Sequence, residues 1–139
     1  MNSPTVIALL GFIGLALFLL VLMEAIRSKM VMFKEVAPNE FNPDNSNLSL
    51  FMQRLARAHA NCIEGLPVFG GLMLVAFVTS NTSVTDQLAY YFLTARIIQS
   101  LIHLLSLSPL AVTLRFCAFA VQMTIAVYWF YKLVEVMLW

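Results

Sequence analysis

The sequence predicts an all-α membrane protein, a single domain over residues 1–139 built as an up-down bundle of four transmembrane helices. Hydrophobic residues make up 61% of the chain and charged residues 11%, whereas a soluble domain carries roughly 25% charged residues. Too little polar surface is left to cover a water-soluble particle. Four apolar stretches are long enough, or nearly so, to cross a hydrocarbon core of about 30 Å.

The first apolar stretch covers about Thr5 to Ile26. It follows Met-Asn-Ser-Pro, with no basic residue before it and no small-residue cleavage site near its end. A signal peptide has a basic N-terminal region and a cleavage site of small residues. We therefore expect a retained membrane helix.

The other three stretches cover about Arg54–Thr79, Asp86–Leu107 and Leu110–Lys132. Turn-forming residues separate all four, in a polar loop at residues 34–49 and in short links at 80–83 and 106–109. Pro109 is suited to the first turn of the last helix. Because short connections join antiparallel neighbours, an up-down topology is expected.

Basic residues gather around the first loop: Arg27, Lys29, Lys34, Arg54 and Arg57. The N-terminal segment and the 80–85 link carry none. The positive-inside rule then places the first loop in the cytoplasm and both termini on the opposite side. The compact length and the lack of a retention signal favour a bacterial inner membrane over the endoplasmic reticulum.

Two of the predicted helices each carry a narrow polar stripe. In the second helix Arg54, Arg57, Asn61 and Glu64 are spaced three, four and three residues apart, which places them within an arc of roughly 80°. The third helix repeats the pattern with Arg96, Gln99 and His103. We expect both stripes to face the interior of the bundle.

The expected depth of these residues brings them together. Glu64 lies about 15 Å into its helix, near the midplane, as does Arg96 on the antiparallel third helix. Arg115 lies about one and a half turns into the last helix, and Arg27 closes the first. All four helices thus present a polar residue to the cytoplasmic half.

A purely structural explanation leaves positive charge unbalanced. Arg27 and Arg54 could extend to lipid headgroups, and Glu64 could pair with one neighbouring arginine. Each buried charge costs roughly 2.5–3.5 kcal/mol on insertion scales, and one Glu cannot balance several cations. Arginine binds carboxylates bidentately, and a carboxylate binds an ammonium group. Asn61 and Gln99 can form hydrogen bonds with amide groups. These groups suit a small peptide with two carboxylates and an amine, such as glutathione.

Other classes of function fit less well. A net charge of +1 gives no field for nucleic acid. Cys62 and Cys117 lie far apart in apolar stretches, so we expect core thiols and no metal site. An ion or proton-relay subunit, or a transporter, is an alternative because buried charges mark ion paths. However, the outer half offers no polar continuation over residues 72–78 and 88–93.

The segment 54–67, RLARAHANCIEGLP, resembles the second-helix signature of the MAPEG family, Arg-x-x-Arg-Ala-His-x-Asn-x-x-Glu followed by Pro. Arg96 to His103 resembles the third-helix pattern of that family, with His103 where many members have Tyr. Arg115 and Arg27 resemble its arginines in the fourth and first helices. The spacing from His103 to Arg115 is a few residues longer than in the family.

The resemblance implies a homotrimer that binds glutathione as a co-substrate between subunits, without a metal. It implies a glutathione transferase or peroxidase acting on lipophilic electrophiles or lipid hydroperoxides from the bilayer; a non-catalytic glutathione-binding protein is the alternative. Arg115 would stabilise the thiolate. By the same resemblance the glutathione-binding residues would be Arg57, Asn61, Glu64 and Arg96, with contributions from Arg27, Arg54, Gln99 and His103.

Overall fold

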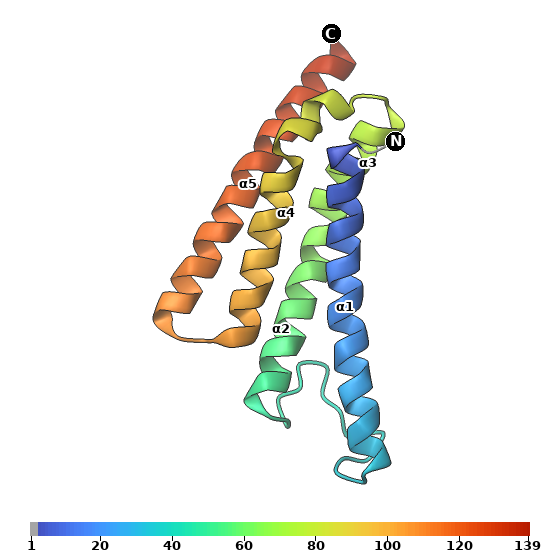
Figure 1. Ribbon diagram of the computed structural model, residues 1–139, viewed down its shortest axis with the longest axis vertical. Helices are drawn as coiled ribbons and strands as arrows, with labels where there is room; N and C mark the ends of the chain where they lie inside the picture. Colours follow the sequence, from blue (N-terminus) through green and yellow to red (C-terminus); the bar gives the residue numbers. More distant parts are fainter. Residues whose placement is uncertain (1–2) are drawn as a thin grey trace.

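The computed structural model describes residues 3–139 and forms a bundle of four membrane-spanning helical segments (Figure 1). The first span is α1 (Pro4–Met32). The second is continuous from Leu50 to Val78 and consists of α2 (Leu50–Gly65), a π-helical turn η1 (Leu66–Gly70) and α3 (Gly71–Val78). The third and fourth are α4 (Thr82–Leu105) and α5 (Pro109–Leu138). The predicted all-α bundle is confirmed, and the chain is an integral multi-pass membrane protein.

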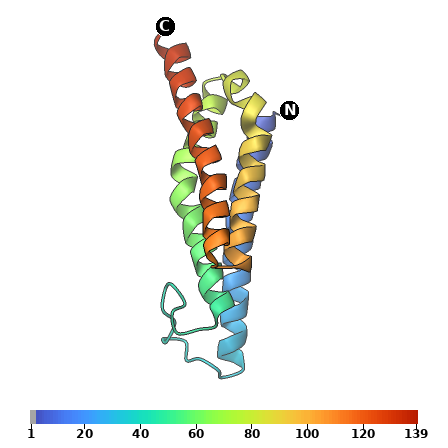
Figure 2. The same ribbon diagram turned by 90° about the vertical axis from the view of Figure 1, so that its left-hand side faces the viewer.

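The spans alternate in direction. Both termini lie at one end of the bundle, here called the terminal end (Figures 1 and 2). The 33–49 loop and the turn between α4 and α5 lie at the other, here called the loop end. The up-down topology therefore agrees with the prediction.

The first helix runs further than hydropathy suggested, to Met32 rather than Ile26. It ends where Lys34 adopts a left-handed conformation with φ of 57°. The Glu35 N–H then donates to the carbonyl of Met30 over 2.8 Å, a bond typical of a Schellman helix ending. Hydropathy marks the stretch that crosses lipid, whereas this hydrogen bond marks where the helix ends.

The start of α5 agrees with the prediction from Pro109, which occupies its first turn. The Ser108 hydroxyl accepts from the Ala111 N–H over 3.2 Å and caps the helix. Proline has no N–H to leave unsatisfied at this position, and serine supplies the acceptor.

Asp86 of α4 caps the start of α1 from a neighbouring span. Its Oδ1 accepts from the Thr5 N–H over 3.0 Å, from the Thr5 hydroxyl over 2.5 Å and from the Ser3 hydroxyl over 2.8 Å. A carboxylate satisfies free N–H groups and complements the positive end of the helix dipole. This contact fixes α1 against α4 at the terminal end.

The π-helical turn lies halfway along the second span. Pro67 has no N–H and cannot continue the regular α-helical bonding, so the chain takes one wider turn before α3 begins. Phe69 of this turn packs against Phe92 of α4, with ring centroids 5.1 Å apart, and Phe92 contacts Trp129 of α5 at 5.5 Å. These buried rings join three spans directly beside the polar residues described next.

Candidate functional site

Arg96 of α4 lies in the centre of the bundle with no exposed surface. Its guanidinium carbon is 4.9 Å from the ring centroid of Phe12 and 5.6 Å from that of Phe69, distances that allow cation–π attraction. Nη1 donates to Asn61 Oδ1 over 2.6 Å. Nε and Nη2 are buried and have no partner among residues 3–139.

The absence of a side chain at Gly65 leaves room for the guanidinium group of Arg96. A Cβ at this position would lie 2.9 Å from Arg96 Nη2 and 3.1 Å from the Phe69 ring. Glycine at this position therefore allows the second span to lie close to the Arg96 side chain.

Replacing Gly65 with Ala is expected to displace the guanidinium and to weaken its bond to Asn61. Overpacking of this kind typically costs about 1–3 kcal/mol, which a fall in thermal unfolding temperature in detergent would report. Gly71→Ala is the matched control, because a Cβ there meets nothing within 4 Å. Equal unfolding temperatures for the two variants would contradict this account.

A chain of side-chain amides joins three spans at the level of Arg96. Gln99 Nε2 also donates to Asn61 Oδ1, over 3.1 Å, and Gln122 Nε2 of α5 donates to Gln99 Oε1 over 2.7 Å. Gln122 was not among the site residues predicted from the sequence. It lies seven residues after Arg115, on the same helix face, and that spacing is a signal that could have found it.

Arg115 and His103 meet between α5 and α4. Arg115 Nη1 lies 2.7 Å from His103 Nδ1 and 3.2 Å from Nε2. Since arginine can only donate, the ring nitrogen that faces it accepts. The side chain of Arg115 is partly buried, and its Nε has no partner in the described part of the chain.

Arg54 binds the end of a neighbouring helix. Its Nε donates to the carbonyl of Leu104 over 2.8 Å. Carbonyl groups in the last turn of a helix lack partners within the helix and carry partial negative charge. Arg54 thereby joins α2 to the last turn of α4.

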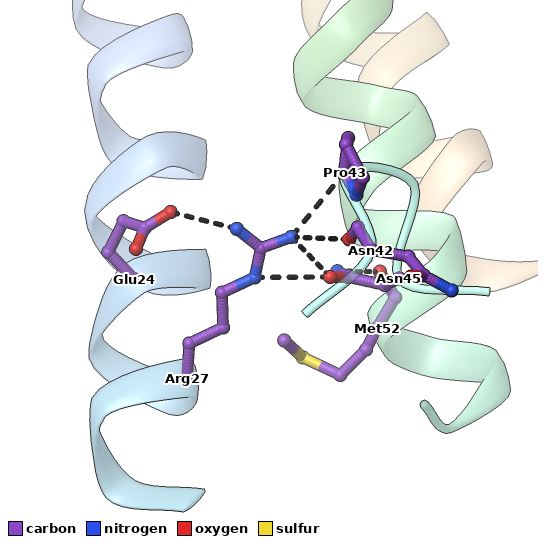
Figure 3. Close-up of polar contacts among 6 residues, drawn as sticks. All are labelled: Glu24, Arg27, Asn42, Pro43, Asn45 and Met52. Atoms are coloured by element: carbon purple, nitrogen blue, oxygen red, sulfur yellow. Dashed lines mark hydrogen bonds and ion pairs between the residues drawn. The ribbon is translucent and has the colours of Figure 1, made fainter. Parts of the chain in front are cut away.

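Arg27 binds the first loop (Figure 3). Its Nε and Nη2 donate to Asn45 Oδ1, and Nη2 also donates to the Asn42 carbonyl over 3.2 Å. Asn45 is completely buried, and its Nδ2 donates to the Met52 carbonyl of α2 over 2.7 Å. The pair therefore fastens the loop between α1 and α2. Asn45 was not expected to matter, since nothing in the sequence separates it from the other loop asparagines.

Arg57 and Glu64 are exposed on the surface of the chain. The two ion pairs within residues 3–139, Arg27–Glu24 and Lys132–Glu135, involve neither of them. The expected inward-facing stripe of α2 is therefore divided. Arg54 and Asn61 bond to α4, whereas the other edge of the stripe turns away from it.

A groove of about 360 Å³ lies between the second span and α5. Asn61 and Glu64 form its polar end. Gly65 and apolar side chains form the rest of the lining. The apolar residues are Val68, Phe69, Phe119, Met123, Ala126 and Val127. A second, apolar groove of about 450 Å³ shares Val68, Ala126 and Val127 with it and reaches Phe130.

The arrangement provides hydrogen-bond donors, a carboxylate and a long apolar surface side by side. It can hold a polar molecule with an ammonium group at Glu64 and an apolar molecule along α5. Comparison with known families gave one match, in which the model of the MAPEG family matches residues 4–134. No match was found among curated proteins or among solved structures.

Proposed function

The chain belongs to the MAPEG family of membrane proteins, and from this we propose that it is a membrane-bound glutathione transferase or peroxidase. Glutathione would be the co-substrate, and its thiolate would react with lipophilic electrophiles or lipid hydroperoxides. The family includes glutathione transferases and related enzymes. The excess positive charge in the bundle, the positions of the arginines and the grooves support the rest of the proposal.

The observation that carries the proposal is an excess of arginine in the loop-end half and at the centre of the bundle. Arg54, Arg57, Arg96 and Arg115 come from three spans, and within residues 3–139 none of them forms an ion pair. Glu64 is the acidic residue of the groove. The two carboxylates of glutathione would supply the missing negative charge, and Glu64 would bind its ammonium group.

Exposed Arg57 and Glu64 support an assembled site. Charged side chains on a spanning helix rarely face lipid and usually point toward protein or water. We place them at the contact between subunits of a homotrimer, where glutathione would bind from the loop end, with that end in the cytoplasm. Arg27 and Arg54 would add positive potential near the entrance, and Gln99 and His103 would support the residues that touch the ligand.

The second substrate would occupy the apolar grooves. Val68, Val127 and Phe130 line them and are exposed on the membrane-spanning surface. A lipophilic compound concentrated in the bilayer would therefore reach the polar end laterally. In the transferase reaction the glutathione thiol loses its proton and the thiolate sulfur bonds to the electrophilic carbon, whose bond to the leaving group breaks; with 1-chloro-2,4-dinitrobenzene the leaving group is chloride. With a hydroperoxide, the thiolate sulfur takes the terminal oxygen and the alcohol leaves, and a second glutathione then yields the disulfide and water.

The test uses detergent-purified protein with glutathione, 1-chloro-2,4-dinitrobenzene and a lipid hydroperoxide. We expect saturable glutathione binding by calorimetry and turnover of at least one substrate. Glu64→Gln should weaken glutathione binding by about tenfold, the effect of losing one charge-assisted bond of roughly 1.4 kcal/mol. Absence of glutathione binding would rule out the proposal. Glutathione-independent ion flux in liposomes would favour a transporter, and binding without turnover a non-catalytic protein.

A further inference from the structure

We infer that Gln122 is a positioning residue that acts through Gln99 and, together with Arg96, holds the Asn61 amide with its oxygen toward α4, which leaves its NH₂ group free for the groove. Gln122 is completely buried in α5 and does not line the groove beside Asn61. The part of the inference that concerns the ligand rests on the proposed function. The orientation of the Asn61 amide is independent of the proposed function, because it follows from contacts within the chain.

The first step is the orientation of Asn61. Arg96 Nη1 lies 2.6 Å from one atom of the Asn61 amide, and because arginine only donates, that atom is the oxygen. Gln99 Nε2 donates to the same oxygen over 3.1 Å. The NH₂ group of Asn61 is left without a partner in the described chain, in a residue that lines the groove.

The second step is the orientation of Gln99. An amide can bind in either of two orientations, and the partner beyond it decides which one is occupied. Gln122 Nε2 donates to Gln99 Oε1 over 2.7 Å, so Gln99 Nε2 must face Asn61. Gln122 is itself oriented by the carbonyl of Ala118, which can only accept and lies 3.1 Å from the same Nε2. The backbone of α5 thus sets the direction of donation in Gln99, whose bond to the Asn61 oxygen adds to the bond from Arg96.

The third step concerns what the groove recognises. With its oxygen held by Arg96 and Gln99, Asn61 has its N–H donors to offer to the groove, and Glu64, three residues later on the same wall, has a carboxylate. The site therefore requires a carbonyl or carboxylate oxygen close to an amino or amide nitrogen. The amino-acid ends and peptide bonds of a small acidic peptide have this order. A reversed Asn61 amide would place two acceptors side by side and would reject the same ligand.

The experiment compares the full-length wild type with Gln122→Met, a variant of similar shape that can no longer donate. The first readout needs no ligand. In protein labelled with ¹⁵N-asparagine, the side-chain NH₂ signals of Asn61, assigned by their loss in Asn61→Ala, should shift or broaden in Gln122→Met. Thr124→Val is the matched control on α5, because within residues 3–139 the Thr124 hydroxyl bonds only to the Ala120 carbonyl of its own helix. Unchanged Asn61 signals in Gln122→Met would overturn the inference whether or not glutathione binds.

The second readout is glutathione affinity in a double-mutant cycle. Gln122→Met should raise the dissociation constant and KM about fivefold to tenfold, the effect expected for one hydrogen bond, with little change in kcat. In the Asn61→Ala background the same substitution should have no further effect. An equal loss in both backgrounds would mean that Gln122 acts on the bundle in general, and would overturn the inference. If the wild type binds no glutathione, the proposed function fails and the NMR result alone decides the role of Gln122.

Discussion

Replacing Arg115 with Ala is expected to abolish the ultraviolet absorbance of the glutathione thiolate while leaving much of the glutathione affinity intact. A thiol with a pKa of about 8.5 is only a few per cent ionised at neutral pH. An adjacent arginine lowers the pKa of an acid by about 1–3 units. The thiolate fraction at neutral pH, and with it the conjugation rate, should therefore fall by roughly 10-fold to 30-fold, with a smaller change in the dissociation constant.

The contact that holds Arg115 in place involves His103, and a control cation lies on the same helix. His103 accepts from Arg115 Nη1 over 2.7 Å and holds the guanidinium between α4 and α5. Lys132→Ala is the matched control, since Lys132 is a cation on the same helix, 17 residues nearer the terminal end, and pairs with Glu135. It should leave the thiolate absorbance unchanged. Thiolate absorbance that persists in Arg115→Ala would exclude the role proposed for Arg115.

Replacing Asn45 with Ala is expected to release the first loop and to lower the free energy of unfolding by about 2–5 kcal/mol. The side chain is completely buried and accepts from two nitrogens of Arg27. It also donates to the Met52 carbonyl over 2.7 Å. Its removal takes away the acceptor of the Arg27 Nε and the link to the Met52 carbonyl, and hydrogen bonds to charged groups contribute about 1.5–3 kcal/mol each.

Thermal unfolding in detergent and limited proteolysis within residues 33–49 measure the effect. Asn47→Ala is the control from the same loop, because the exposed Asn47 side chain makes one bond, to the Glu40 carbonyl over 2.7 Å. It should change stability by no more than about 0.5 kcal/mol. Proteolysis of the loop at the same rate in both variants would show that Asn45 does not fasten it.

The spans could be predicted from the sequence because their signals are local. Apolar length, the polar loop and Pro109 each report on a few neighbouring residues, and each agrees with the structure. The end of α1 at Met32 could not be predicted in this way. It depends on the left-handed conformation of Lys34 and on a hydrogen bond between Glu35 and Met30, to which a hydropathy pattern is insensitive.

The site could be predicted only in part, for a related reason. The three-and-four spacing identified Asn61, Arg96 and Gln99, which the structure joins in one hydrogen-bonded network. Spacing gives the angle between residues on one helix but not the direction of its neighbours, so the exposure of Arg57 and Glu64 was not foreseen. Gln122 shares a helix face with Arg115, but that spacing does not show its contact with Gln99 of α4. Asn45 acts through contacts with α1 and α2, and the sequence around it contains no mark of them.

The apolar grooves along α5 also determine how concentration should be expressed for this protein. Because Val68 and Phe130 are exposed on the membrane-spanning surface, a hydrophobic compound that binds in these grooves would reach them from a two-dimensional phase. The amount of compound available to the protein then depends on the mole fraction of that compound in the lipid or micelle. Adding detergent while the total amount of compound stays constant lowers this mole fraction. Apparent constants for such compounds are comparable between preparations only at equal amphiphile content.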